Sequence, residues 1–212
     1  MKNYEVNSVE KGTLQINGFG DHPLWEKAAV LTDFISPWEN HEPKKIELRA
    51  LWDSENVFFY YKVWDNEVYI DKTDDTAESI ANSDRVEIFL RKDADLSPYY
   101  CFEIDPEPRI LDFIAFPNRN FDYEWKWPEN HLQVKSNQNE NYFTVEIAIS
   151  IESLKQLKLL NGNTIEAGFY RAKYIKQNET YEPVWITWVN PNTPTPDFHI
   201  ASSFGKLILI GF

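Results

Sequence analysis

Hydrophobic and polar residues alternate with a period of two in two neighbouring stretches of the chain, residues 83–90 and 98–105. One face of the first stretch is apolar and consists of Val86, Ile88 and Leu90. The matching face of the second stretch consists of Tyr100, Phe102 and Ile104. This period is typical of β-strands with one face in the core and one in solvent. We therefore predict two adjacent antiparallel strands, with Arg85, Glu87 and Glu103 on their solvent faces.

Similar alternation, or a run of β-branched and aromatic residues, predicts further strands along most of the chain. They lie at residues 46–52, 56–64, 110–116, 132–136, 142–149, 164–176, 184–189 and 206–210. Helical spacing is limited to residues 24–31 and 150–159, and no linker or internal repeat separates the strands. The predicted fold is all-β: a single-domain antiparallel β-sandwich of two sheets with few short helices, spanning residues 1–212.

Two predicted loops contain candidate binding residues. Asp71, Asp74 and Asp75 lie close together in the loop at residues 67–83, and oxygen-rich loops suit calcium. Their spacing is not that of an EF-hand, and the same carboxylates could instead cap a turn. In the loop at residues 117–130, the aromatic segment at residues 121–127, with Trp125, is a candidate stacking platform, and packing of these rings against the core is the alternative.

The composition limits the kinds of molecule that the chain is expected to bind. The chain of 212 residues has a net charge of −13, which excludes phosphate-rich nucleic acid and anionic membranes as expected partners. No apolar run approaches transmembrane length, and the sequence begins without a signal peptide. From the sequence as it stands we therefore expect a cytoplasmic protein, or an extracytoplasmic one if a leader peptide has been removed. A single cysteine excludes an intramolecular disulfide, and the oligomeric state stays open.

Four short motifs occur in an order that resembles a known family. They are Asn17-Gly18 with Trp25 and Ala28, the LWD at residues 51–53, the DRVEIF at residues 84–89, and the FGKL at residues 204–207. This pattern resembles the family 9 carbohydrate-binding modules that are associated with bacterial xylanases. The resemblance implies a β-sandwich that grips the end of a glycan chain, such as xylan, between two aromatic rings. It also implies polar contacts to sugar hydroxyls and calcium ions in structural loops.

Transfer of the family's binding residues to this chain gives a mixed result. Glu87 matches a glutamate that the family uses to bind hydroxyl groups. The two stacking tryptophans of the family fall on Ala81 and on Phe198, and a family arginine falls on Glu103. The resemblance therefore implies the same fold with a rebuilt site.

The candidate carbohydrate-binding residues are Arg85, Glu87, Glu103, Trp125, Arg171 and Phe198. Arg171 is included because its strand alternates so that its guanidinium would share a polar face with the two glutamates. The favoured function is non-catalytic carbohydrate binding, with no catalytic residue and no required cofactor. Two alternatives remain open: a glycoside hydrolase that uses the paired carboxylates, which needs them about 5–9.5 Å apart, and an interaction or scaffold domain that has lost sugar binding.

Overall fold

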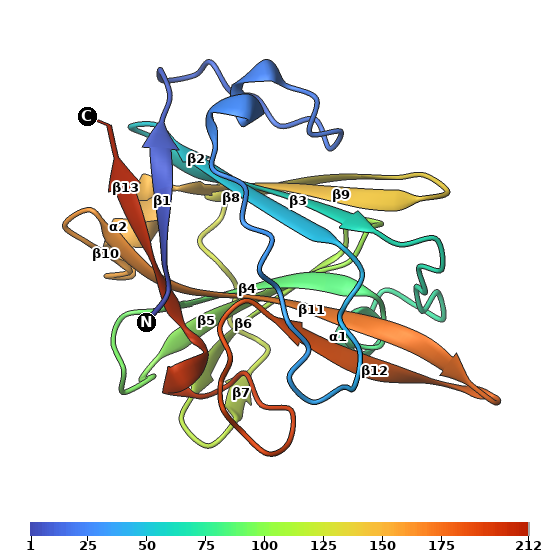
Figure 1. Ribbon diagram of the computed structural model, residues 1–212. Coiled ribbons are helices and arrows are strands. Elements are labelled where there is room, and N and C mark those ends of the chain that lie inside the picture. The colour runs from blue at the N-terminus through green and yellow to red at the C-terminus, as the bar shows by residue number, and fades with distance from the viewer. Residues whose placement is uncertain (212) are drawn as a thin grey trace.

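The computed structural model describes residues 1–211 and consists mainly of one 13-stranded sheet that curls over on itself (Figure 1). One layer of the curl is formed by β2 (Ile46–Trp52), β3 (Asn56–Trp64), β9 (Tyr142–Ser150) and β8 (Leu132–Gln138). The other layer is formed by β4 (Arg85–Arg91), β5 (Tyr99–Ile104), β6 (Ile110–Phe116), β7 (Asn120–Asp122), β10 (Leu160–Asn161), β11 (Thr164–Gln177) and β12 (Thr180–Thr187). The all-β prediction is confirmed.

Two terminal strands join the layers into a single sheet. β1 (Asn3–Ser8) pairs in parallel with both β2 and β13 (Gly205–Ile210), and β13 pairs with β11. The predicted sandwich of two separate antiparallel sheets is therefore not confirmed. The difference arises at β1, whose short run of alternating residues places Tyr4 and Val6 in the core but did not stand out in the sequence.

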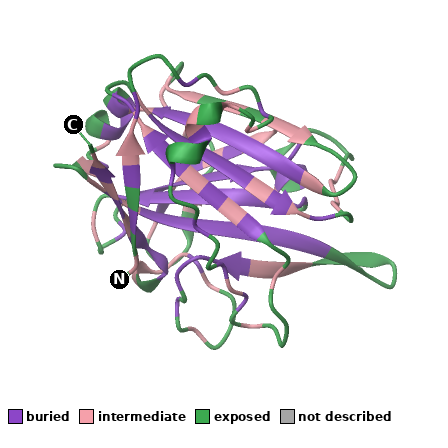
Figure 2. Cartoon of the chain, turned by 45° about the horizontal axis from the view of Figure 1, so that its top comes forward, coloured by how far each residue is buried: buried purple, intermediate pink, exposed green. Residues whose placement is uncertain are grey.

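The main core fills the space between the two layers. Phe169 of β11 meets two rings of β3, Phe59 at 5.8 Å and Tyr61 at 6.4 Å between ring centroids. The Tyr61 hydroxyl donates to the carbonyl of Glu87 at 3.1 Å, so one hydrogen bond also crosses between the layers. Figure 2 shows the buried residues running along the strands of both layers, while exposed residues lie mainly in the connections. This packing holds β4 and β5 rigidly.

The predicted pairing of β4 with β5 is confirmed, with Val86 opposite Ile104 and Glu87 opposite Glu103. The apolar faces of both strands lie in the main core, as predicted. The prediction that the other face is solvated is wrong. A second hydrophobic cluster, which includes Phe89 and Cys101, covers that face, and every residue of β4 and β5 is buried. Much of this cover comes from Ile80, from Leu96 and from the loop that follows β12, which contributes Phe198 and Phe204.

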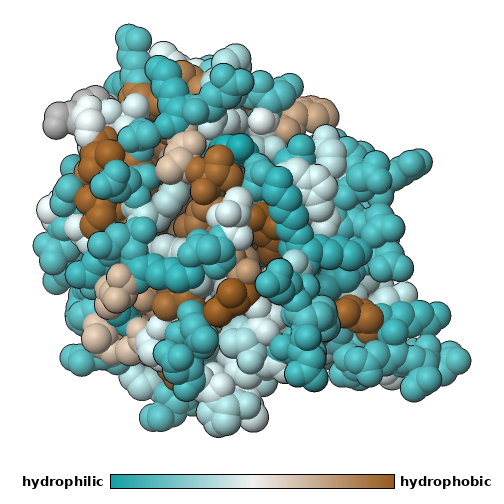
Figure 3. Space-filling view, viewed as in Figure 1, coloured by the Kyte–Doolittle hydropathy of each residue, from teal (hydrophilic) through white to brown (hydrophobic). Residues whose placement is uncertain are grey.

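Helical structure is limited to short segments. They are the 3₁₀ helices η1 (Pro23–Lys27) and η2 (Ala201–Ser203) and the α-helices α1 (Ala77–Ala81) and α2 (Ile151–Gln156). The Ser150 side chain accepts from the Ser153 backbone N–H at 3.0 Å and starts α2, as the sequence predicts. Within residues 1–211 no helix is long and apolar enough to cross a membrane. Hydrophilic side chains cover most of the face seen in Figure 3, between smaller hydrophobic patches.

Candidate functional site

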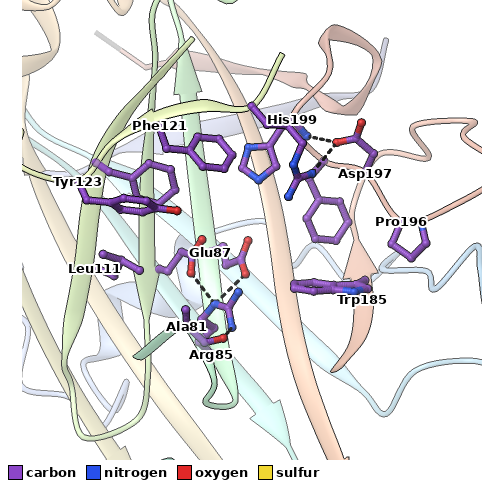
Figure 4. Close-up of a pocket in the computed structure, with 14 residues that line it drawn as sticks. Ala81, Arg85, Glu87, Leu111, Phe121, Tyr123, Trp185, Pro196, Asp197 and His199 are labelled. Atoms are coloured by element: carbon purple, nitrogen blue, oxygen red, sulfur yellow. Dashed lines mark hydrogen bonds and ion pairs between the residues drawn. The ribbon is translucent and has the colours of Figure 1, made fainter. Parts of the chain in front are cut away.

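A cleft of about 270 Å³ opens on the face of the β4–β5–β6 layer that points away from the main core. Its size is close to the lower end of the range of about 300–1,000 Å³ that small-molecule pockets occupy. Figure 4 shows Phe121 and Tyr123 on one side and Trp185 and Pro196 on the other, with Arg85 and Glu87 between them. The cleft thus has a charged floor and largely aromatic walls.

The floor consists of Arg85 and Glu87 from β4 and Glu103 from β5. The Arg85 Nε lies 3.0 Å from Glu87 Oε1 and 2.8 Å from Glu103 Oε2. Arg85 Nη1 donates to the carbonyls of Ala81 and Ser83, which anchors the guanidinium to the end of α1. Because Glu87 and Glu103 are directly opposed in the strand register, both carboxylates reach the same nitrogen.

Burial controls the protonation of this floor. Glu87 is only 1% exposed, and its burial raises the pKa of its carboxyl well above the usual range. Arg85 opposes this rise, whereas the neighbouring Glu103 adds to it. Burial tends to lower the pKa of Arg85, but the two carboxylates outweigh that effect and raise it, so the guanidinium stays charged. The floor therefore combines a permanent cation with a buried carboxyl group, that of Glu87, whose pKa is raised.

The walls present rings from three parts of the chain. Phe121 lies on β7, Tyr123 follows that strand and is 45% exposed, and the two rings meet at 5.9 Å between centroids. On the opposite wall, Trp185 of β12 meets Phe198 edge-to-face at 5.7 Å. The guanidinium carbon of Arg85 lies 5.6 Å from the centre of the Trp185 ring. Opposed aromatic walls of this kind suit a flat ligand with apolar faces.

A salt bridge and a histidine lie at the rim of the cleft. Arg119, in the turn between β6 and β7, lies 3.3 Å from Asp197 in the loop after β12. The ring of His199 contacts Phe121 at 4.7 Å, and its Nδ1 shares a hydrogen bond with the Tyr99 hydroxyl at 2.9 Å. Burial, helped by nearby arginines, lowers the pKa of His199 to about 3. The imidazole is therefore neutral at ordinary pH.

Arg171 does not face the glutamates, contrary to the prediction. Tyr170 is the residue of β11 that pairs with Glu87, and Arg171 pairs with Val86, so the guanidinium points to the opposite face of the sheet. There it is buried and lies 2.5 Å from Asp65 and 3.4 Å from Asp84. Both faces of β11 are covered, so the alternation along this strand does not show which face carries Arg171 toward the main core.

Trp125 also lies away from the cleft. Its ring packs on Tyr100 at 5.1 Å and on Trp127 at 6.0 Å between centroids, beside the main core. Trp127 is buried and donates from its Nε1 to the Ser153 hydroxyl at 3.2 Å. Both rings therefore pack against the core, which is the alternative that the sequence left open for Trp125. Of the six candidate residues, Arg85, Glu87, Glu103 and Phe198 lie together in the cleft.

The acidic loop is organised around an arginine. Arg109 donates to the carbonyls of Asp71 and Asp74, each at 2.8 Å, and to the carboxylate of Asp105 at 2.7 Å. The carboxylates of Asp71 and Asp74 accept backbone N–H groups within their own turns. Among residues 1–211 no group of three or more acidic, histidine or cysteine side chains could hold a metal ion. Arg109 therefore occupies the carbonyl oxygens of Asp71 and Asp74 in this loop.

Replacing Arg109 with alanine will destabilise the fold by about 2–3 kcal/mol, since several partly buried hydrogen bonds to a charged group are lost. Urea unfolding followed by tryptophan fluorescence measures this change. Lys72→Ala is the control: it removes an exposed ion pair with Glu107 at the same loop and will change stability by less than about 1 kcal/mol. We also expect the wild-type midpoint not to move when calcium or a chelator is added. A chelator that lowered it would contradict this account of the loop.

The sequence did not single out Trp185 and His199, which line the cleft, and within the predicted stacking segment at residues 121–127 it favoured Trp125 over Phe121 and Tyr123. Trp185 lies within a strand, where a tryptophan is typical of the core, and only the pairing of β12 with β11 places it beside Arg85. Tyr123, Phe121 and His199 come from loops or a short edge strand, whose positions have no periodic signal. The aromatic content of 16% was the one general hint.

Comparisons with known proteins agree with this architecture. The chain is similar to a candidate carbohydrate-binding protein from Bacteroides uniformis ATCC 8492, with 17% identity, 99% coverage of both chains and a TM-score of 0.75. It is also similar to a carbohydrate binding module family 9 from Caldicellulosiruptor kristjanssonii, solved in complex with glucose and with cellotriose. Each of those two structures is 16% identical, with a TM-score of 0.61, and the match covers 100% of this chain and 97% and 95% of those chains.

The search of curated proteins found no match. The family model described as carbohydrate family 9 binding domain-like matches residues 16–212. Because this match spans nearly the whole chain, the protein belongs to the carbohydrate family 9 binding domain-like family.

Proposed function

We propose that this protein is a non-catalytic carbohydrate-binding protein and that the cleft above β4 and β5 is its binding site. The observation that carries the proposal is the arrangement of Arg85, Glu87 and Glu103 on the floor between the aromatic walls. Membership of the carbohydrate family 9 binding domain-like family supports it, as do the structural neighbours solved with glucose and cellotriose.

The chemistry of a sugar ring is complementary to this arrangement. Its axial C–H groups make apolar faces that can stack on Trp185 from one side and on Phe121 or Tyr123 from the other. Its hydroxyl groups lie around the edge of the ring, where the carboxylates accept charge-assisted hydrogen bonds and Arg85 donates.

The volume and the rim restrict how much of a glycan can enter. A cleft of about 270 Å³ accommodates little more than one sugar ring. The Arg119–Asp197 salt bridge lies at the rim, between the turn after β6 and the loop after β12. We therefore expect the cleft to contact a single sugar residue, and a longer oligosaccharide to extend from it into solvent.

Isothermal titration with glucose, cellotriose and xylo-oligosaccharides tests this proposal. Glu103→Gln is expected to weaken binding at least about tenfold, because one charged acceptor on the floor is lost. Glu152→Gln, which changes an exposed carboxylate on α2, is the matched control and will leave binding unchanged.

The absence of binding heat with the whole panel would overturn the proposal. Release of reducing sugar by the wild type, abolished in Glu103→Gln, would instead identify the protein as a hydrolase. Thermal melts of both variants ensure that any loss of binding is measured on folded protein.

A further inference from the structure

The floor of the cleft contains two acidic groups and one basic group. Two carboxyl groups, those of Glu87 and Glu103, share one guanidinium, that of Arg85. At the rim, Arg119 is paired with Asp197 and adds no net charge. His199 adds none, because burial lowers its pKa to about 3. The charge of the empty cleft is therefore that of a single uncompensated carboxylate, unless a proton neutralises it.

The geometry of the ion pairs shows which group lacks a partner. Arg85 directs its Nη1 to the backbone carbonyls of Ala81 and Ser83, so only its Nε lies between the two carboxylates. Glu87 Oε1 lies 3.0 Å from this nitrogen, and among residues 1–211 neither of these two atoms makes an aligned hydrogen bond. A buried carboxylate oxygen without an aligned donor is costly, and a ligand that brings a donor with positive charge would remove that cost.

The aromatic walls also favour a positively charged ligand group. Phe121, Tyr123 and Trp185 line the cleft, and the faces of their rings attract a cation that is shielded from water. The net charge of −13 on the whole chain also favours the approach of cations. A neutral hydroxyl group would gain much less from these features than an ammonium group of similar size.

We propose that the cleft selects sugars that carry a free amino group, bound as ammonium ions, over neutral sugars of the same shape. This inference rests on the proposed carbohydrate-binding function and specifies its ligand class. The ammonium group would lie against the carboxylates of Glu87 and Glu103, while the sugar ring stacks between Trp185 and the opposite wall.

Proton exchange is a consequence of this mode of binding. The titratable and charged groups that face Glu87 are Arg85 on β4, Glu103 and Cys101 on β5, Tyr170 and Tyr174 on β11, and Tyr61 on β3. Burial raises the pKa of Glu87, so the empty cleft holds a proton at neutral pH or below. An ammonium ligand favours the ionised carboxylate and displaces this proton, whereas a neutral sugar leaves it in place.

Titration of the wild-type protein with glucosamine, glucose and N-acetylglucosamine tests the inference. At about pH 6, where a free amine is protonated, we expect glucosamine to bind at least about tenfold more tightly than glucose. N-acetylglucosamine, whose amide is uncharged, is expected to bind no more tightly than glucose. Titrations in two buffers of different ionisation enthalpy should show proton release with glucosamine and none with glucose.

Glu87→Gln provides the second arm, because glutamine is a neutral isostere of the protonated acid. It should lose the preference for glucosamine over glucose, measured as the ratio of the two Kd values in the variant itself, and it should lose the proton release. If wild-type protein binds glucosamine no more tightly than glucose, the inference is overturned while carbohydrate binding stands. If none of the three sugars, cellotriose or the xylo-oligosaccharides binds, the proposed function itself fails.

Discussion

Replacing Trp185 with alanine will weaken sugar binding by about 2 kcal/mol or more, a factor of about thirty in Kd. The Trp185 ring forms one wall of the cleft and is only partly buried, so its removal takes away a stacking surface more than it disturbs the core. The ring also lies over the Arg85 guanidinium at 5.6 Å, and its loss exposes that cation to water. Isothermal titration with the tightest ligand of the panel measures the effect.

Trp125→Ala is the matched control for this experiment. Both residues are partly buried tryptophans, but Trp125 packs beside the main core against Tyr100 and takes no part in the cleft. We expect Trp125→Ala to lower the melting temperature and to leave the Kd within about twofold of the wild type, because packing and binding are separate at this position. Equal losses of affinity in the two variants would refute the assignment of the site to this cleft.

Replacing Asp65 with asparagine will destabilise the protein by about 3–5 kcal/mol, the cost of breaking a buried ion pair from one side. Asp65 is 2% exposed and lies 2.5 Å from Arg171 and 3.0 Å from Lys173. An amide in its place leaves these two cations facing only Asp84. Urea unfolding followed by circular dichroism measures the change, with Glu107→Gln at an exposed ion pair as the control.

The same cluster gives the stability a defined dependence on pH. Burial alone would raise the pKa of Asp65, but Arg171 and Lys173 outweigh it and hold that pKa well below its unfolded value of 3.8. A carboxyl group whose pKa is lowered by folding contributes stability above its unfolded pKa, and this contribution is lost as the pH falls toward its folded pKa. The difference in stability between the wild type and Asp65→Asn should therefore shrink below about pH 4. A constant difference down to strongly acidic pH would contradict this role of Asp65.

The local pattern of β4 and β5 was sufficient to predict the residues of the floor. The period of two identified both strands, their pairing and the faces of Val86 and Ile104, all of which are confirmed. Because the period alternates strictly, Glu87 and Glu103 had to lie on one common face. That inference needed no knowledge of the rest of the molecule, since neighbouring strands of a hairpin are close in sequence.

The walls of the cleft and the surroundings of Arg171 depend on contacts between distant parts of the chain. Trp185 reaches the floor only because β12 continues the sheet beside β11, and Tyr123 reaches it only because a short β7 pairs with β6. Arg171 was misplaced because both faces of β11 are buried, so hydrophobicity alone could not show which face looked inward.

The sequence by itself therefore determined the all-β class, the strand pair that carries the two glutamates and the resemblance to a carbohydrate-binding family. Only the tertiary structure decided that the layers join in one curled sheet, that Arg109 holds the acidic loop, and which aromatic rings face the glutamates. The physical reason is the separation along the chain over which each kind of interaction acts. Strand periodicity and turn chemistry act between residues close in sequence, whereas a cleft is assembled from side chains whose neighbours are set by long-range strand pairing.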